Sequence, residues 1–287
     1  MSESPEFIGS TWGRLSWSEW IPLDAPLGEY QRAISDGGGL YRVRGSGIRE
    51  LVYIGQTGRN LRERTRSLAS GVRCDRNDPP WNDPHTAAPL LWAYRHENNM
   101  TFEVSVAEQD VNVAERQCWE DMLLYLHRRE ANCSTLCNHG RLHPHWTRPS
   151  NRKKGIATAR RSEPVFFPSS KLAAGNMDCS ADDWLGLSWS QPIGLQTSAG
   201  PPVAGVYRLM SPEGMVVYIG ESADLRQRLK AHSKTYDGQS LLASWHRTSS
   251  TAKHQLHELE ADLIGAFYLE YQRPPVFQYM DKNRMRP

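Results

Sequence analysis

One pattern occurs twice in this chain of 287 residues. The stretch VYIG, followed by a turn and an arginine-bearing helix pattern, stands at residues 52–68 and again at 217–232. Three further pairs accompany it: WGRLSWS at 12–18 and WLGLSWS at 184–190, GLYRV at 39–43 and GVYRL at 205–209, WEDMLL at 119–124 and LEADLI at 259–264. Chance similarity would not preserve order and spacing together, so these pairs indicate an internal duplication. We expect two units of one kind.

The repeats set the expected domain boundaries. The first copy covers residues 10–146 and the second covers 182–287, with a linker at 147–181. The linker lacks a periodic apolar pattern and is rich in Pro, Ser, Arg and Lys. Its basic residues either follow the phosphates of a nucleic acid or form a solvated tether. They are Arg148, Arg152, Lys153, Lys154, Arg160 and Arg161.

Composition excludes several classes of protein. With 39% hydrophobic and 23% charged residues, the chain can bury the cores of two domains. Its net charge of +2 is too small to identify a partner. No apolar run approaches the roughly 20 residues of a membrane span, and MSESPEFIGS lacks signal-peptide features, so we expect a cytoplasmic protein without a membrane partner. Five cysteines without framework spacing favour reduced thiols.

Local patterns predict the same elements in each copy. Two short strand patterns with a loop between them predict a hairpin. A turn follows, then Asn60 or Asp224 as the N-cap of a short helix, a third strand, and a closing helix at 113–129 or 253–271. The expected fold class is α+β, with two tandem small domains. Each is a three-stranded, mainly antiparallel sheet flanked by helices.

An arginine lies about one turn into each short helix. Arg64 follows Gly55 by nine residues, and Arg228 follows Gly220 by eight. A helix N-terminus offers unpaired N–H groups, and a guanidinium beside it fits phosphate oxygens. The alternative is a surface arginine on an amphipathic helix. The repetition favours a phosphate-binding role.

A glutamate falls at the same place in each closing helix. In the second copy Glu260 lies within an apolar stripe formed by Leu256, Leu259, Leu263, Ile264 and Phe267. A carboxylate in such a stripe needs a partner, which a divalent metal or an arginine would supply. The first-copy stripe is less regular, so Glu120 is either an equivalent site residue or an exposed acid paired with Arg116.

Four tyrosines complete the repeated set. Tyr41 with Tyr53, and Tyr207 with Tyr218, each place two phenols across one expected hairpin. Gly-Leu-Tyr with Tyr-Ile-Gly, and Gly-Val-Tyr with Tyr-Ile-Gly, resemble the two signature triplets of the GIY-YIG nuclease superfamily. The resemblance extends to the helix arginine, the later glutamate and a polar residue near the end of each copy.

The resemblance implies metal-dependent hydrolysis of phosphodiesters. It assigns a divalent ion, Mg²⁺ or Mn²⁺, to Glu120 and Glu260. It assigns water activation to Tyr41 and Tyr207. By the same resemblance, Tyr53 and Tyr218 orient the water and the phosphate. Arg64 and Arg228 offset the charge of the transition state, and Asn138 braces the site.

The two copies depart from the family pattern in different ways. The second copy has Gln278 where the family favours asparagine, and it carries His232 one turn after its arginine, as many restriction enzymes of the family do. The first copy has Asn138 but Leu68 in place of the histidine. A competing chemistry, structural zinc, would use Cys133, Cys137, His139 and His143.

A single site of this type cuts one strand, so two copies predict double-strand cleavage by one chain. We therefore expect a restriction-like DNA endonuclease acting on double-stranded DNA, monomeric, with internal pseudo-twofold symmetry. Three alternatives stay open: a nickase, a nucleic-acid binding module in which one or both sites are inactive, or small-molecule chemistry on the same scaffold.

Overall fold

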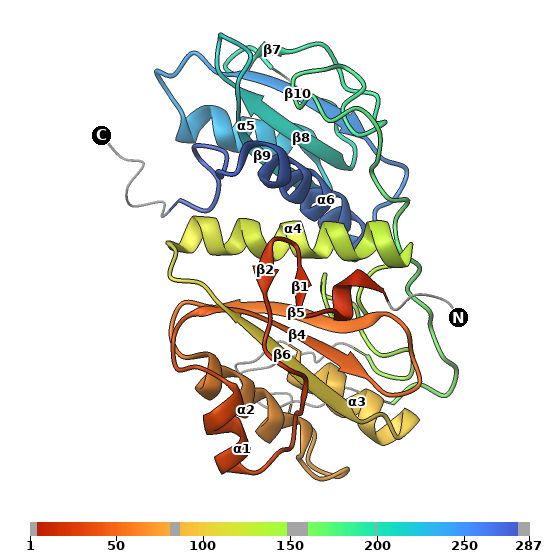
Figure 1. Cartoon of the computed structure of the whole chain (residues 1–287). Helices are drawn as coiled ribbons and strands as arrows, with labels where there is room; N and C mark the ends of the chain where they lie inside the picture. Colours follow the sequence, from red (N-terminus) through yellow and green to blue (C-terminus); the bar gives the residue numbers. More distant parts are fainter. Residues whose placement is uncertain (1–4, 81–86, 148–159, 199, 281–287) are drawn as a thin grey trace. The chain divides into compact units, whose positions relative to one another are not determined.

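A computed structural model describes residues 5–80, 87–147, 160–198 and 200–280 (Figure 1). It is a mixed α/β structure with antiparallel sheets and, within these residues, six α-helices. Within the same residues, no helix combines the length and the apolar character needed to cross a membrane.

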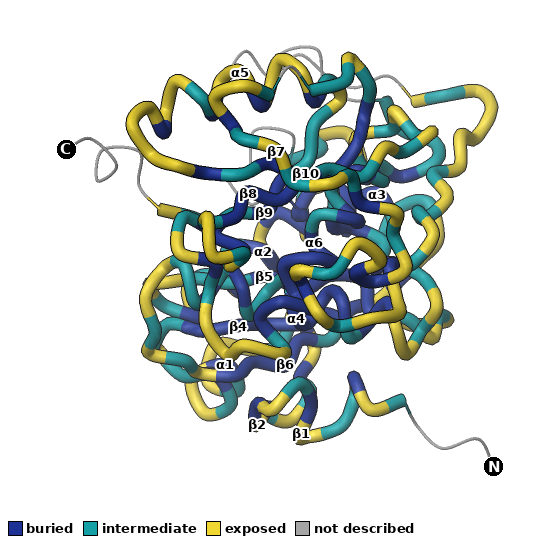
Figure 2. The backbone as a smooth tube through the Cα atoms, turned by 90° about the horizontal axis from the view of Figure 1, so that it is seen from above, coloured by how far each residue is buried: buried dark blue, intermediate teal, exposed yellow. Residues whose placement is uncertain are grey.

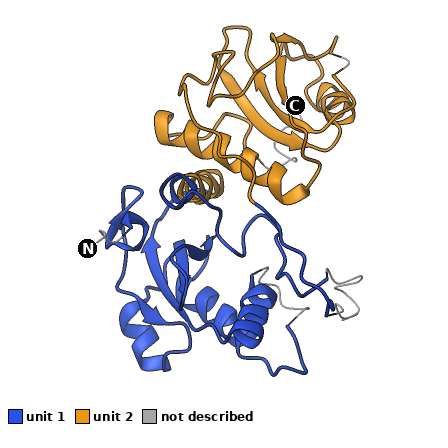
Figure 3. Cartoon of the chain, turned by 90° about the vertical axis from the view of Figure 1, so that its right-hand side faces the viewer, with its two compact units in different colours: residues 1–112, 126–168 blue, residues 113–125, 169–287 orange. Residues whose placement is uncertain are grey.

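Backbone contacts divide the chain into two compact units, coloured separately in Figure 3. The first unit contains residues 1–112 and 126–168, and the second contains 113–125 and 169–287. Helix α4 (Val113–Ala131) therefore begins in the second unit and ends in the first. The repeat pattern assigns all of α4 to the first copy, and the predicted domain boundaries stay a prediction.

The first unit contains a four-stranded antiparallel sheet in the order β3-β6-β4-β5. A 3-10 helix and a short hairpin precede it, and three helices accompany it. The elements are η1 Glu6–Ile8, β1 Thr11–Trp12, β2 Leu15–Ser16, β3 Ile21–Pro22, α1 Leu27–Ala33, β4 Gly39–Gly45, β5 Leu51–Thr57, α2 Leu61–Val72, α3 Ala88–Asn98 and β6 Phe102–Glu108.

The second unit repeats this topology with fewer elements. Its antiparallel sheet has the order β7-β10-β8-β9, in which each strand takes the place of its first-unit counterpart. The elements are β7 Ile193–Gly194, β8 Gly205–Met210, β9 Val216–Ser222, α5 Leu225–Thr235, β10 Leu242–Arg247 and α6 Lys253–Tyr271.

The sheets differ from the expected three strands. Each has a fourth, two-residue edge strand, β3 or β7, which pairs with the third strand of the repeat pattern. Two residues carry no detectable period, so this strand is defined only by its tertiary pairing. The first unit also contains α3, which was not predicted. It lies in the stretch that makes the first copy longer between Tyr53 and Glu120.

The helix starts follow the sequence signals. Asn60 caps α2 by accepting a hydrogen bond from the Glu63 amide (2.9 Å), and Asp224 caps α5 by accepting one from the Gln227 amide (3.0 Å). The predicted closing helix at 253–271 coincides with α6. The caps fix where each short helix begins, and hence the height of its arginine above the sheet.

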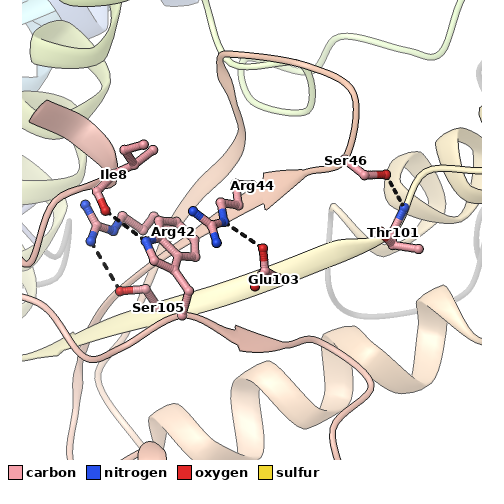
Figure 4. A network of polar contacts seen from close by, with 8 residues as sticks. Ile8, Arg42, Arg44, Ser46, Thr101, Glu103 and Ser105 are labelled. Atoms are coloured by element: carbon pink, nitrogen blue, oxygen red, sulfur yellow. Dashed lines mark hydrogen bonds and ion pairs between the residues drawn. The ribbon is translucent and has the colours of Figure 1, made fainter. Parts of the chain in front are cut away.

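The repeated tryptophan segments cover the face of each sheet opposite the tyrosines. Neighbouring residues of a strand point to opposite faces, so Tyr41 and Arg42 diverge, as do Tyr207 and Arg208. Arg42 is fully buried, donates to the carbonyls of Phe7 and Gly9 (2.6 Å each), and lies 4.2 Å from the Trp17 ring centroid. Figure 4 shows its further contact with Ser105.

The second unit builds the same arrangement. Arg208 is fully buried, donates to the carbonyl of Cys179, and lies 4.5 Å from the Trp189 ring centroid. The Ser244 hydroxyl donates to the Ser190 carbonyl (2.7 Å), and the Ser105 hydroxyl donates in the same way to the Ser18 carbonyl (2.8 Å). The repeated leaders are therefore structural. In Figure 2 the central strands β4 and β8 are mostly dark blue, the colour of buried residues.

Candidate active site

Two stacked tyrosines form the centre of the second-unit site. Tyr207 on β8 lies opposite Gly220 on β9, and the rings of Tyr207 and Tyr218 are 5.9 Å apart, centroid to centroid. A Cβ atom at Gly220 would collide with the Tyr207 ring. Glycine is therefore required at this position so that the phenol can lie across the neighbouring strand.

A chain of polar contacts links this pair to α5. Arg228 Nε donates to Tyr207 Oη (3.0 Å), and its Nη2 donates to Tyr218 Oη (3.4 Å). His232, one turn later, places Nε2 2.7 Å from Tyr207 Oη. Arg228 and His232 are four residues apart, so one helix face presents both to one phenol.

Burial sets the protonation of Tyr207. Its side chain is fully buried, and desolvation raises its pKa well above the usual value; Tyr218 adds to the rise and Arg228 opposes it. Tyr207 is therefore a neutral phenol at physiological pH. Because its oxygen already accepts from Arg228, its own proton is available to His232 Nε2.

A buried amide braces the strand that carries Tyr218. Gln278 is 3% exposed, and its Oε1 accepts from the Ile219 amide (3.0 Å). In the first unit, Asn138 Oδ1 accepts from the Ile54 amide (3.0 Å) and Asn138 Nδ2 donates to the Ile54 carbonyl (2.8 Å). The longer glutamine reaches the equivalent backbone group, so the second copy keeps a brace despite its departure from asparagine.

Three possible metal ligands converge beside the tyrosines. Glu221 follows Gly220 on β9, and His257 and Glu260 share one face of α6. His257 Nδ1 lies 3.7 Å from Glu260 Oε2 and 3.9 Å from Glu221 Oε1. The ligand atoms of all three lie within 4.8 Å of one another. Burial raises the pKa of Glu221, and the nearby charge of Glu260 raises it further. A divalent cation fits this donor set.

Several residues of the site line one pocket. Its volume is about 870 Å³, and its lining includes Tyr218, Arg228, His232, Glu260 and Gln278. The α5 arginine, the α6 glutamate and the C-terminal glutamine therefore share one solvent-accessible space. That space can admit a phosphate group between the Glu260 carboxylate and the Arg228 guanidinium.

The α4 segment of the second unit packs against α6, where the Trp119 and Tyr268 rings are 5.6 Å apart, centroid to centroid. Tyr279 Oη donates to the carboxylate of Asp121, and a Cβ atom at Gly265 would meet the Asp121 carbonyl at 2.5 Å. Burial raises the pKa of Asp121 well above its usual value; the Tyr279 hydrogen bond opposes this, and Glu120 and Glu260 add to it. Gly265 therefore permits close helix packing.

The first unit keeps only part of this arrangement. The rings of Tyr41 and Tyr53 are 5.9 Å apart, and a Cβ atom at Gly55 would lie 2.6 Å from the Tyr41 phenol oxygen. Arg64 Nε, however, is buried and has no hydrogen-bond partner among the described residues. Leu68 occupies the position of His232 and offers no polar group.

Glu120 belongs to a different unit from the first-copy tyrosines. It lies on α4 within residues 113–125, which group with the second unit, whereas Tyr41, Tyr53, Arg64 and Asn138 lie in the first. Two ligands of the second-unit group also have no counterpart in the first copy. Gln56 stands where Glu221 stands, and Gln117 stands where His257 stands.

The predicted basic and zinc-binding residues have other contacts. Arg160 pairs with Glu97 (2.9 Å), and Arg161 lies 5.9 Å from the Phe167 ring centroid. The other four linker residues lie outside the described residues. They are Arg148, Arg152, Lys153 and Lys154.

The structure does not gather Cys133, Cys137, His139 and His143 as metal ligands. In the described residues, the one group of at least three convergent ligands is Glu221, His257 and Glu260. Cys137 is buried in the first-unit core, and His143 Nε2 contacts Asn98 Oδ1 (2.9 Å). Core packing therefore occupies Cys137, and a hydrogen bond occupies one ring nitrogen of His143.

Comparison with protein families finds a GIY-YIG catalytic domain at residues 203–267. This range contains both tyrosines, Arg228, His232 and the three convergent ligands. The domain indicates nuclease-type activity, generally dependent on a divalent metal, with DNA as the substrate that such a domain suggests. The family match does not extend to the first copy. Searches of curated proteins and of solved structures return no significant match.

Sequence reasoning missed Glu221 and His257. Each is polar and common on surfaces, and they lie 36 residues apart, on a strand and a helix. A position-by-position comparison of the two copies offers a signal, because both positions change from glutamine to a metal-binding residue.

Proposed function

We propose that the second unit is a metal-dependent DNA endonuclease centre that hydrolyses phosphodiester bonds. The observation that carries this proposal is the contact chain from Arg228 through Tyr207 to His232, next to a pocket that also presents Glu260. It supplies a phosphate-binding cation, a proton path and a metal-binding carboxylate around one space.

Each residue has a distinct part in the reaction. Tyr207 takes a proton from the attacking water while it passes its phenolic proton to His232, so no free tyrosinate has to form. Arg228 holds both phenols and offsets the charge that builds on the phosphate. Glu260 would hold the divalent ion, which when bound stabilises the leaving oxygen. Gln278 fixes the strand that carries Tyr218.

We infer that one chain cuts one strand. The first copy has Leu68, Gln56 and Gln117 where the second has His232, Glu221 and His257, so it lacks a proton acceptor and two metal ligands. Cleavage of both strands would then require a second event or a second chain. The alternative is the two-site, restriction-like mechanism. It is supported by the pairing of Tyr41 with Tyr53 and by the Asn138 brace, which the first copy shares with the second.

A supercoiled plasmid distinguishes these mechanisms. With Mg²⁺ or Mn²⁺, the protein is expected to convert it to nicked circles, and linear DNA should appear only later. Glu260→Ala should abolish nicking, whereas Glu120→Ala and the exposed control Glu270→Ala should retain it. Linear DNA formed at once, with nicking alone in either site variant, would establish two active sites. Unchanged cutting by Glu260→Ala would refute the assignment.

The first unit is proposed to bind DNA. Its pocket of about 390 Å³ has Arg73, Arg76, Arg95 and His96 in its lining against one acid, Asp24, and it contains none of the predicted catalytic residues. Positive charges gathered there suit phosphate groups. In a Glu260→Ala background, Arg73→Ala with Arg76→Ala should weaken DNA binding and lower the salt slope by about one per lost phosphate contact. Lys171→Ala, on the second unit, is the matched control.

A further inference from the structure

We propose that Glu221, His257 and Glu260 together form a three-ligand site that selects a first-row transition-metal dication, such as Mn²⁺, over Mg²⁺. The use of this ion in DNA cleavage rests on the function proposed above, but the site itself is defined by its ligands.

The spacing of the ligand atoms agrees with a single bound ion. Ligands about 2.1 Å from a metal lie roughly 3.0 to 4.2 Å from one another in tetrahedral or octahedral sites. The distances of 3.7 and 3.9 Å from His257 Nδ1 to the two carboxylates fall within this range. All three ligand atoms lie within 4.8 Å of one another, so a small approach of the two carboxylates would close the site around an ion.

The elements that carry the ligands are rigid. His257 and Glu260 are three residues apart on α6, a helix of 19 residues, so they share one face. Glu221 is held on β9, which pairs with the central strand β8. All three side chains are partly buried, which reduces the entropy that is lost when an ion binds.

The local charge also calls for a cation. Among the residues that the structure describes, no lysine or arginine lies within ion-pair distance of Glu221 or Glu260, and His257 is their shared neighbour. Two partly buried carboxylates that approach one imidazole repel each other. A dication between them would remove this repulsion.

The imidazole decides which ion is preferred. Mg²⁺ binds through oxygen ligands and keeps several waters, whereas imidazole nitrogen is a good ligand for transition metals. The first copy differs at these positions. It has Gln56 and Gln117 in place of Glu221 and His257, so Glu120 is the one metal-binding side chain that it retains of the three. One tight transition-metal site per chain is therefore expected.

The site can be tested without DNA cleavage by titrating the full chain with Mn²⁺. The electron paramagnetic resonance signal of the free ion measures how much Mn²⁺ is bound. We expect one tight site, displaced by Mg²⁺ only at large excess. His257→Gln, which copies the first unit, should weaken Mn²⁺ binding about tenfold or more while changing Mg²⁺ binding far less. Glu270→Gln, at an exposed position of the same helix, should leave Mn²⁺ binding unchanged.

Several outcomes would overturn the proposal. They are equal affinity of the wild-type chain for Mn²⁺ and Mg²⁺, undiminished Mn²⁺ binding by His257→Gln, or an equal loss of Mn²⁺ binding in Glu270→Gln. The wild-type competition needs no variant, and circular dichroism checks that each variant is folded. Tight, His257-dependent Mn²⁺ binding without DNA cleavage would refute the proposed function alone. Mg²⁺-supported nicking without selective Mn²⁺ binding would refute the metal site alone.

Discussion

The two units share a scaffold and differ in the residues that would perform chemistry. Both have the same strand order, a buried arginine beneath tryptophans, and an amide side chain bonded to the backbone of the Tyr-Ile-Gly strand. They differ at three matching positions, where the first copy has Leu68, Gln56 and Gln117 and the second has His232, Glu221 and His257. Buried packing changes at a high cost in stability, whereas pocket residues change at little cost.

The largest expected contrast lies in the first-triplet tyrosines. Tyr207→Phe removes the proton acceptor, so kcat for nicking should fall by about 10³-fold. Tyr41→Phe should leave kcat within about twofold if the first unit is inactive. Single-turnover nicking of a plasmid measures both. Comparable losses in the two variants would mean that the units act alike.

In contrast to activity, stability should depend similarly on the buried arginine in each unit. Arg42→Met leaves two carbonyl groups without a donor and Arg208→Met leaves one, which should cost about 3 kcal/mol of unfolding free energy in either unit. Urea denaturation with probes in each unit measures this. A large loss in one unit and none in the other would show that the shared scaffold is not equally important.

A smaller effect should follow when the second site is made to resemble the first. His232→Leu removes the group that accepts the phenolic proton of Tyr207, so kcat should fall about 10²-fold, with KM little changed. His232→Gln retains a polar group and should recover part of the rate. A change confined to KM would indicate that His232 contacts DNA and does not act through Tyr207.

The smallest expected effects concern the helix caps. Asp224→Ala and Asn60→Ala each remove one side-chain acceptor from a helix start, which should lower the unfolding free energy by about 1 kcal/mol. Thermal unfolding measures the loss. Only Asp224→Ala should also slow nicking, because α5 carries Arg228. Equal slowing by Asn60→Ala would assign a catalytic part to α2.

Local sequence patterns predicted most of the helices and strands but not the edge strands of the sheets. The hairpins, the caps and the closing helix at 253–271 follow from short-range periodicity and capping chemistry. The edge strands β3 and β7 and the helix α3 were missed. Strands of two residues have no period, and the buried face of α3, which includes Trp92, does not stand out from its apolar neighbours.

By itself, the sequence determined that one residue pattern occurs twice and that tyrosines, an arginine and a glutamate recur at matching positions, because repetition and spacing are properties of the chain. Only the tertiary structure decided that Glu221 meets His257 and Glu260, and that His232 reaches Tyr207. These contacts join residues on separate strands and helices. Their proximity depends on how α5 and α6 pack on the sheet, which no local pattern encodes.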